Sequence, residues 1–460
     1  MTTTVITNAT IVTCDAARTV LYDSALAIDG SRIAAVGPTA QVRASYPDAE
    51  VVGGRGKAVF PGLINCHAHL TANLFRGISE DFGFPSSFSF PDDVRNMVSD
   101  EETVIMAILG AIECARTGCT TTVEISSGID RYAGALAQTG LRWVLAENTS
   151  DGVVEPTFRA GEPVLQYSDA LREKSLEQAT RLFEKWDGQE EGRITCMGST
   201  GLVETSSPAL LRDVHTLAER YDSRYTIHLN QSQLEVESLM LMRGVRPTQS
   251  LFANDYLGPR LLAAHCRFLD PSEISLLGTT RSNIAHQPAM AARRAVIPPI
   301  PALRDAGCTI GMGTDNNTQD MVEVMRTGLF TERILRQDGT NPQPEDVLMM
   351  TTMGSAKAIG MADSIGSLEV GKKADLFVVN TRRSNLAPTM RIVSAFVHNG
   401  QPSDIESVMV DGGFVMRDGK VLKVDEEAVI AKADGIGRRV WHRLLKKYPN
   451  VPFPVTLAPE

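Results

Sequence analysis

The segment Pro61-Gly-Leu-Ile-Asn-Cys-His-Ala-His-Leu70 places two histidines directly after an apolar run. We expect a β-strand over Ala58–Cys66, because short runs of apolar and β-branched residues favour strands. Residues two apart on a strand point to the same side, so the side chains of His67 and His69 can reach one ion. A His-x-His pair alone is weak evidence for a metal site, and the other ligands have to come from elsewhere in the chain.

Similar apolar runs recur along the chain and alternate with amphipathic helical stretches. Candidate strands lie at Ala58–Cys66, Thr120–Ile125, Arg142–Ala146, Ile194–Leu202, Tyr225–Leu229, Arg260–His265, Ser282–His286 and Thr309–Thr314. Alternating βα units indicate a parallel sheet, and eight such units within about 300 residues favour a closed (β/α)8 barrel. A doubly wound open sheet is the alternative, although no GxGxxG motif follows an early strand.

Most of the histidines fall at the carboxyl ends of these predicted strands. His67 and His69 follow the first strand, His228 lies in the fifth, His265 ends the sixth, His286 ends the seventh, and Asp315 follows the eighth. In a (β/α)8 barrel these ends face the functional mouth, so the imidazoles and the carboxylate would converge on a transition-metal site. We expect His215, His398 and His442 to be ordinary core or surface residues.

The amino-acid composition indicates which partners and which cellular compartment to expect for the protein. The chain has 460 residues and a formal net charge of −10, which argues against nonspecific binding to nucleic acid or anionic membranes. Its 7 cysteines form no CxxC pair, which indicates free thiols in a reducing compartment. The chain shows neither a basic-then-apolar leader nor an apolar stretch of about 18 residues. We therefore expect a soluble cytoplasmic protein, and base rates favour a homo-oligomer.

Both ends of the chain are rich in short β-strands and tight turns. Asp29-Gly30 near the start, and Asp411-Gly412 and Asp418-Gly419 near the end, separate apolar runs as hairpin turns do. Because chain termini often lie close together, the two ends could form one small sheet domain, and two separate β caps are the alternative. Beyond them, Asp425–Lys447 predicts a helix, and residues 448–460 form a proline-rich, irregular tail.

In combination, these motifs resemble those of the amidohydrolase superfamily. The resemblance rests on Pro61–Leu70, Ile227–Leu229, Ala263–Cys266, Gly313–Asn316 and the segment Gly366-Ser-Leu-Glu-Val-Gly-Lys-Lys-Ala-Asp-Leu376. It implies an α/β hydrolase whose metal-dependent (β/α)8 barrel spans 58–365. It also implies a composite β-sandwich domain from 1–57 and 366–424, followed by a helix and tail over 425–460. The motifs are most similar to the cytosine-deaminase and triazine-hydrolase branch.

The resemblance also bears on the number of metal ions. Two-metal members of the superfamily usually bridge their ions with a carbamylated lysine on the fourth strand. This chain has no lysine between Lys185 and Lys357, and Glu204 would be a poorer bridge. We predict a single divalent ion, with zinc favoured and iron or cobalt also compatible. Its ligands would be His67, His69, His228 and Asp315.

The resemblance implies a hydrolytic mechanism. The ion would lower the pKa of a bound water toward about 7. Asp315 could accept the proton of this water, while His265 orients the water and stabilises the oxyanion. His286 could contact the substrate or the leaving group, and a structural role for this residue is equally well supported.

One departure from the family pattern guides the choice of substrate. Deaminases of this branch carry a glutamate three residues after the fifth-strand histidine, whereas this chain has Gln231, whose amide cannot carry a proton to a ring nitrogen. We expect Gln231 to contact the substrate instead. An acyclic urea, carbamate or thiocarbamate has less need of such a proton carrier.

The loop after His69 suggests an apolar pocket. Five of the 15 phenylalanines fall within residues 75–90, and Phe75, Phe82 and Phe84, with Met290, could cover an apolar substrate. Packing of this loop against neighbouring helices is the alternative. With Gln231, the loop resembles the phenylurea hydrolases and molinate hydrolase, which implies cleavage of a carbamoyl C–N or C–S bond in an apolar xenobiotic.

Two other functions stay open at this stage. The first is an aminohydrolase or dechlorinase of a heteroaromatic ring of the triazine, pterin or pyrimidine type, which would share the metal site and need a substitute for the missing glutamate. The second is a noncatalytic barrel that serves as an interaction subunit. The complete set of ligands argues against the second function.

Overall fold

The central feature of the fold is a barrel of parallel strands. The computed structural model describes residues 3–87 and 89–459. One parallel sheet contains β6 (Leu63–Ala68), β7 (Cys119–Ser126), β8 (Arg142–Glu147) and β9 (Ile194–Cys196). The other contains β10 (Gly198–Leu202), β11 (Tyr225–Leu229), β12 (Leu261–His265), β13 (Asn283–His286) and β14 (Thr309–Met312). The single bridges Ala68–Asp315 and Thr149–Thr200 join the two sheets, so the predicted barrel is confirmed.

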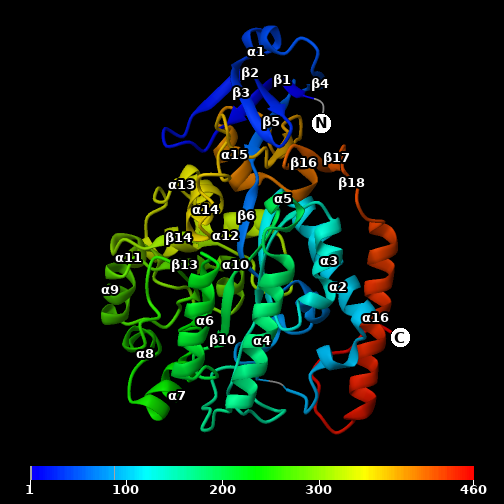
Figure 1. Ribbon diagram of the computed structural model, residues 1–460. Helices are drawn as coiled ribbons and strands as arrows, with labels where there is room; N and C mark the ends of the chain where they lie inside the picture. The colour runs from blue at the N-terminus through cyan, green and yellow to red at the C-terminus, as the bar shows by residue number, and fades with distance from the viewer. Residues whose placement is uncertain (1–2, 88, 460) are drawn as a thin grey trace.

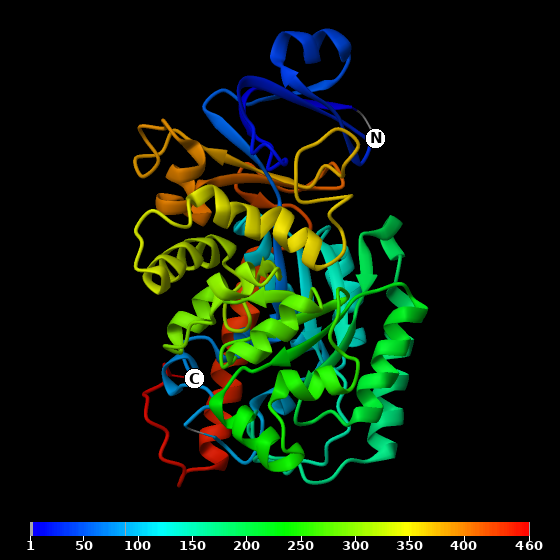
Figure 2. The same ribbon diagram turned by 90° about the vertical axis from the view of Figure 1, so that its left-hand side faces the viewer.

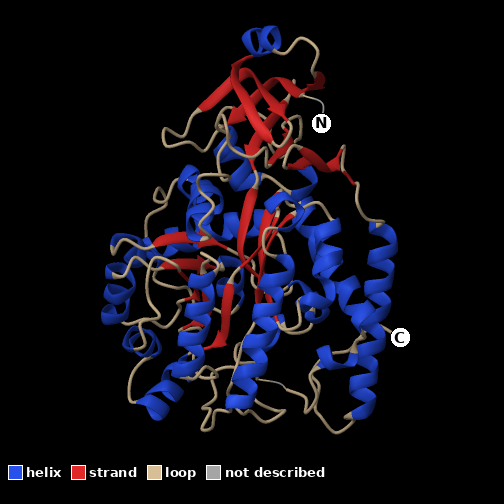
Figure 3. Ribbon diagram, viewed as in Figure 1, coloured by secondary structure: helices blue, strands red, loops and turns tan. Residues whose placement is uncertain are grey.

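Helices surround the strands on the outside (Figure 3). The longer ones are α2 (Asp100–Arg116), α3 (Asp130–Gln138), α4 (Asp169–Trp186), α6 (Pro208–Arg220), α7 (Gln233–Arg243), α9 (Pro271–Thr279), α12 (Met321–Arg336) and α15 (Ile392–Asn399). Shorter helices are α1 (Thr39–Ser45), α5 (Gln189–Gly192), α8 (Pro247–Ala253), α10 (Pro288–Arg293), α11 (Ile300–Asp305), α13 (Pro344–Met349) and α14 (Ser355–Ala358). Several begin at a capping side chain, as α2 does at Ser99 and α6 at Ser207.

The two ends of the chain build one mixed sheet of nine strands. The first end supplies β1 (Thr4–Val12), β2 (Val20–Asp29), β3 (Arg32–Pro38), β4 (Glu50–Gly53) and β5 (Lys57–Pro61). The second end supplies β15 (Leu376–Asn380), β16 (Ile405–Val410), β17 (Gly413–Arg417) and β18 (Lys420–Val421). Antiparallel pairing of β5 with β15 connects the two sets, which confirms a composite β domain and excludes separate caps. The division at residues 57, 365 and 424 stays a prediction.

The predicted first barrel strand, Ala58–Cys66, is two strands that belong to different sheets. Its first part is β5 of the small sheet and its second part is β6 of the barrel. The chain changes sheets at Gly62, where an added Cβ would lie 1.9 Å from the Oγ1 atom of Thr120. Only glycine fits so close a crossing. The predicted fourth strand is likewise divided at Met197 into β9 and β10.

The crossing at Gly62 orients the barrel. The small sheet covers one end of the barrel (Figures 1 and 2), and β6 starts there. Because all barrel strands run parallel to β6, their carboxyl ends lie at the opposite end, where the predicted site residues meet.

The predicted C-terminal helix is α16 (Glu426–Lys447), which lies along α2 (Figure 1). Its buried face contacts η1 (Leu70–Phe75) and η3 (Val94–Met97), two short turns of the loop after β6. All seven cysteines are buried and free, as the sequence predicts. Among the described residues, no helix has the length and apolar character needed to cross a bilayer.

Candidate metal centre and active site

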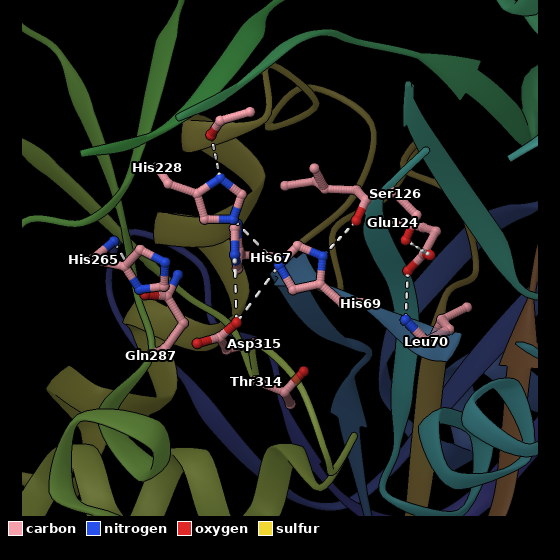
Figure 4. Close-up of polar contacts among 12 residues, drawn as sticks. His67, His69, Leu70, Glu124, Ser126, His228, His265, Gln287, Thr314 and Asp315 are labelled. Atoms are coloured by element: carbon pink, nitrogen blue, oxygen red, sulfur yellow. Dashed lines mark hydrogen bonds and ion pairs between the residues drawn. The ribbon is translucent and has the colours of Figure 1, made fainter. Parts of the chain in front are cut away.

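The carboxyl ends of the barrel strands bring the four predicted ligands together. Strand β6 supplies His67 and leads to His69, β11 supplies His228, and Asp315 lies three residues beyond β14. Figure 4 shows the rings of these histidines, with that of His265 from β12, around the carboxylate of Asp315.

The distances in this cluster suit a single ion. The Oδ1 atom of Asp315 lies 3.8 Å from Nε2 of His67 and 3.6 Å from Nε2 of His69. The donor atoms of His67, His69 and His228 all lie within 4.8 Å of one another, as do those of His67, His265 and Asp315. These two overlapping trios of nitrogen and oxygen donors are typical of a first-row metal site.

The hydrogen bonds of two histidines test whether a cation fits here. The Nδ1 atoms of His69 and His228 each lie 2.5 Å from a backbone carbonyl, of Ile125 and Gly201 respectively. Each Nδ1 therefore donates, which leaves the two Nε2 atoms as unprotonated acceptors only 3.3 Å apart. Two lone pairs facing each other at this distance repel, and a cation between them removes the conflict. The residues therefore fit a metal ion.

Burial keeps the imidazoles of His67, His228 and His265 neutral, the state in which they can bind metal. It lowers the pKa of His228 to about 4 and holds the pKa of His67 and of His265 well below 6.5. Both ring nitrogens of His67 and the Oδ2 atom of Asp315 are buried without a hydrogen-bond partner among the described residues. Such orphaned atoms are expected where an ion or a substrate completes the site.

The backbone at the site is held in an uncommon conformation. His265 has a φ of 73° and Asp315 a φ of 72°, which is the left-handed region that residues other than glycine seldom adopt. The amide of Asp315 donates to the carbonyl of His67 at 2.9 Å, and the amide of His69 donates to the carbonyl of Asp315 at 3.1 Å. These bonds between β6 and the segment after β14 fix the aspartate beside the two histidines.

A buried carboxylate supports the strand end that carries His69. Glu124 on β7 accepts hydrogen bonds from the amide of Leu70 at 2.9 Å and from the hydroxyls of Tyr132 and Ser126 at 2.7 Å each (Figure 4 shows those from Leu70 and Ser126). Burial raises the pKa of Glu124, although these donors and His69 oppose the shift. Glu124 therefore anchors the first residue of the loop that follows His69.

A cavity of about 690 Å³ opens over the cluster, which is a suitable size for a small organic substrate. Among the predicted site residues, it is lined by His69, His228, Gln231, His265, Asp315, Phe75 and Phe84. The Nε2 atom of Gln231 is buried and has no hydrogen-bond partner within the described chain, so it is available to a ligand.

Three predicted substrate contacts lie elsewhere. His286 and Met290 are buried and are not among the described residues that line this cavity. Phe82 lines a smaller neighbouring cavity, and its ring lies 6.3 Å from that of Phe453 in the tail. The ring of Phe75 also lies 6.0 Å from that of Trp441 on α16. Much of the phenylalanine-rich loop thus packs against α16 and the tail, while Phe88 lies outside the described residues.

Two arginines that the sequence analysis did not single out stand beside Asp315. The Oδ2 atom of Asp315 lies 3.9 Å from Nη2 of Arg267 and 4.0 Å from Nη1 of Arg294. Arg267 also donates to Nδ1 of His265 at 3.3 Å, and the guanidinium of Arg294 lies 4.2 Å from the ring centroid of Phe84. Their positions shortly after the sixth and seventh strand ends are the signal that could have found them.

Comparison with known families agrees with this geometry. Residues 58–415 match the model of the Amidohydrolase family. The chain belongs to this family. Residues 25–49 also match the imidazolonepropionase-like composite domain of bacteria. The protein is therefore an amidohydrolase, as the sequence predicts.

Curated relatives are similar over most of their length. A 5-methylthioadenosine/S-adenosylhomocysteine deaminase of Desulforudis audaxviator is 31% identical, over 90% of this chain and 94% of the relative. A 5'-deoxyadenosine deaminase of Methanobrevibacter smithii is 30% identical, over 84% of this chain and 87% of the relative.

Solved structures share the fold. An adenosine deaminase from Xanthomonas campestris with bound zinc has a TM-score of 0.86 at 25% identity, over 95% of this chain and 98% of that one. An atrazine chlorohydrolase from Arthrobacter aurescens has a TM-score of 0.82 at 21% identity, over 94% of this chain and 100% of that one.

These relatives correct the prediction about the substrate. The deaminases among them are named for adenosine-type compounds, which contradicts hydrolysis of a carbamoyl carbon in a urea, carbamate or thiocarbamate. The similarity to phenylurea and molinate hydrolases is likewise unsupported. The prediction depended on Gln231, but one amide in place of a carboxylate does not exclude ring deamination while Asp315 and His265 remain to move or hold protons.

Proposed function

We propose that the protein is a mononuclear metal-dependent aminohydrolase that replaces the exocyclic amino group of an adenosine-type heteroaromatic ring with oxygen and releases ammonia. Two overlapping trios of donors, His67 with His69 and His228 and His67 with His265 and Asp315, are the observation that carries this proposal. The deaminase names of relatives that are at least 30% identical support the choice of reaction.

The ligand set would be His67, His69, His228 and Asp315, holding one divalent ion. When bound, the ion supplies a water of lowered pKa as the nucleophile. Zinc is favoured because the Xanthomonas campestris structure contains it. The predicted homo-oligomer and cytoplasmic location stay predictions.

Asp315 is the group that would move protons. Its Oδ2 atom has no hydrogen-bond partner in the described structure, so it can accept a proton from the attacking water and deliver it to the departing amine. The overall exchange balances, because one water adds to the ring carbon and one ammonia leaves.

His265 and Gln231 would hold the substrate during the attack. Arg267 donates to Nδ1 of His265, so the proton of the neutral imidazole resides on Nε2 and can stabilise negative charge on the oxygen that adds to the reacting carbon. The free amide nitrogen of Gln231 can donate a hydrogen bond to an acceptor on the ring but cannot transfer a proton.

A substrate screen tests the proposal. Purified protein with its native metal would be assayed for ammonia and for the product mass on adenosine, 5'-deoxyadenosine, 5-methylthioadenosine, an aminotriazine and an aminopterin. We expect ammonia from at least one of these, and loss of the activity in Asp315→Asn. Absence of ammonia from every amino-substituted ring, with one metal equivalent present, would overturn the proposal. Two tightly bound equivalents would contradict the single ion.

A further inference from the structure

The charges around the cavity differ in sign from the rest of the chain. The formal net charge of the whole chain is −10, yet four arginines and only two aspartates line the cavity. These residues are Asp93, Arg95, Arg131, Arg159, Arg294 and Asp315. A concave site in which one sign of charge prevails concentrates ligands of the opposite sign.

Three of the four lining arginines have a carboxylate partner of their own. The Nε atom of Arg95 donates to Asp93 at 2.8 Å, the Nη1 atom of Arg131 lies 3.1 Å from Asp100, and the Nε atom of Arg159 lies 2.8 Å from Glu162. Arg294 differs from these three, because its nearest carboxylate is Asp315, at the longer distance of 4.0 Å.

Arg294 also has to share Asp315 with a second cation. The side chain of Arg267 is only 2% exposed, and it faces the same Oδ2 atom at 3.9 Å. The Oδ1 atom of Asp315 points to the histidines on the other side (Figure 4). One carboxylate thus faces two guanidinium groups and the metal donors, which leaves positive charge uncompensated in a buried place.

The position of Arg294 makes it accessible to a ligand. Its side chain is 13% exposed and lines the cavity, and the ring of Phe84 lies against its guanidinium. This contact holds the flat group in one orientation, and a planar fork of donors matches a carboxylate or a phosphate with two parallel hydrogen bonds.

We propose that the substrate carries an anionic group, a carboxylate or a phosphate, close to its reacting ring, and that Arg294 binds this group. The inference rests on the proposed deamination and narrows its substrate class. Because Arg294 lies 4.0 Å from the carboxylate proposed to move protons, the anion belongs beside the reacting carbon rather than at the end of a long substituent.

Matched pairs of substrates and ligands test this inference. Deamination by the metal-loaded protein would be compared for 4-aminopyrimidine-5-carboxylate against its carboxamide, and for 4-aminopyrimidin-5-yl phosphate against 4-amino-5-methoxypyrimidine, because both anions lie beside the reacting carbon. We expect kcat/KM to be at least roughly tenfold higher for one anionic member, and the pair that shows this distinguishes carboxylate from phosphate. Calorimetric binding of pyrimidine-5-carboxylate against its carboxamide gives a readout independent of turnover.

Variants of Arg294 test whether this residue causes the preference for anionic over neutral substrates. Arg294→Gln should lower the anion-to-neutral ratio of kcat/KM about tenfold or more, mainly through KM, whereas Arg294→Lys should retain much of it. Arg131→Gln is the matched control, because Arg131 lines the cavity but has its own partner, and its ratio should change less.

The outcomes separate the inference from the proposed function. A protein that deaminates neutral rings as well as anionic ones, binds both pyrimidine ligands equally, and keeps the same ratio in Arg294→Lys or Arg294→Gln would refute the anion site while deamination stands. No ammonia from any ring would instead refute the proposed function. If Arg294→Gln does not fold, the ratio in Arg294→Lys and the calorimetric comparison in the parent protein decide the matter.

Discussion

At the scale of single residues, Gln231 is the clearest test of how protons move in the site. Its amide lines the cavity, and its nitrogen is buried without a hydrogen-bond partner in the described structure. A carboxyl group of the same shape could carry a proton to a ring nitrogen, so Gln231→Glu should raise kcat for ammonia release by about tenfold or more near pH 6. Steady-state kinetics of the metal-loaded variant measures this effect. Gln231→Met is the control, and a rate in Gln231→Glu no higher than in the control would contradict the prediction.

Glu204, just beyond β10, should make the stability of the protein depend on pH. Burial raises the pKa of this carboxyl to about 7 from 4.5, against the opposing effects of Gly161 and Arg243. Between these pH values the unfolded chain binds fewer protons than the folded chain, so stability present below pH 4.5 is lost as the pH rises toward 7. Glu204→Gln keeps the acceptor for the amide of Gly161 and removes this loss.

We therefore expect Glu204→Gln to be more stable than the parent protein by up to about 3 kcal/mol at pH 8, and close to it at pH 4.5. Thermal or urea unfolding followed across this range measures the difference. If the two proteins differ in stability by the same amount at pH 4.5 and at pH 8, Glu204 is ionised in the folded protein throughout this range.

At the scale of elements, α16 supports the loop that forms one wall of the cavity. Trp441 on this helix is 7% exposed, its indole donates to the carbonyl of Leu74 at 2.9 Å, and its ring lies 6.0 Å from that of Phe453. Trp441→Ala should cost about 3–5 kcal/mol of stability and raise KM, because Leu74 also lines the cavity.

The matched control, Trp441→Phe, keeps one aromatic ring and loses the hydrogen bond and part of the indole volume, so its cost should be smaller, about 1–2 kcal/mol. Urea unfolding and KM would be measured for both variants. Equal stabilities in the two variants, or an unchanged KM in Trp441→Ala, would show that α16 does not support the cavity wall.

The sequence predicted most elements closely but missed two breaks. The predicted helix Asp425–Lys447 matches α16 to within one residue, because its cap and apolar spacing are local signals. Local signals cannot show that an apolar run changes sheets, so Ala58–Cys66 was predicted as one strand. The break at Gly62 depends on the approach of Thr120, which lies far away in sequence.

At the scale of the whole molecule, the metal donors could be predicted and the cavity walls could not. Parallel strands bring their carboxyl ends together whatever the loops do, so five of the six predicted strand-end residues meet at the centre, and His286 lies outside the described cavity lining. The walls come from loops whose paths depend on distant packing partners. Phe82 therefore contacts the C-terminal tail rather than the predicted pocket, and Arg294 enters the site from a segment that had been expected to be apolar.

The barrel and the composite sheet are joined by a buried ion pair that should make them unfold together. Arg142 on β8 is 4% exposed and lies 2.8 Å from both Asp375 and Asp411. Burial opposes its charge, but the two aspartates outweigh this effect and raise the pKa of Arg142 above its ordinary value. Arg142→Met leaves both carboxylates without this partner, so it should cost about 3–5 kcal/mol of stability and split a single calorimetric transition into two.

The exposed pair Arg438–Asp434 provides the control, since Arg438→Met should cost less than about 1 kcal/mol of stability. Equal costs, with one transition in both variants, would mean that apolar packing alone holds the two parts together.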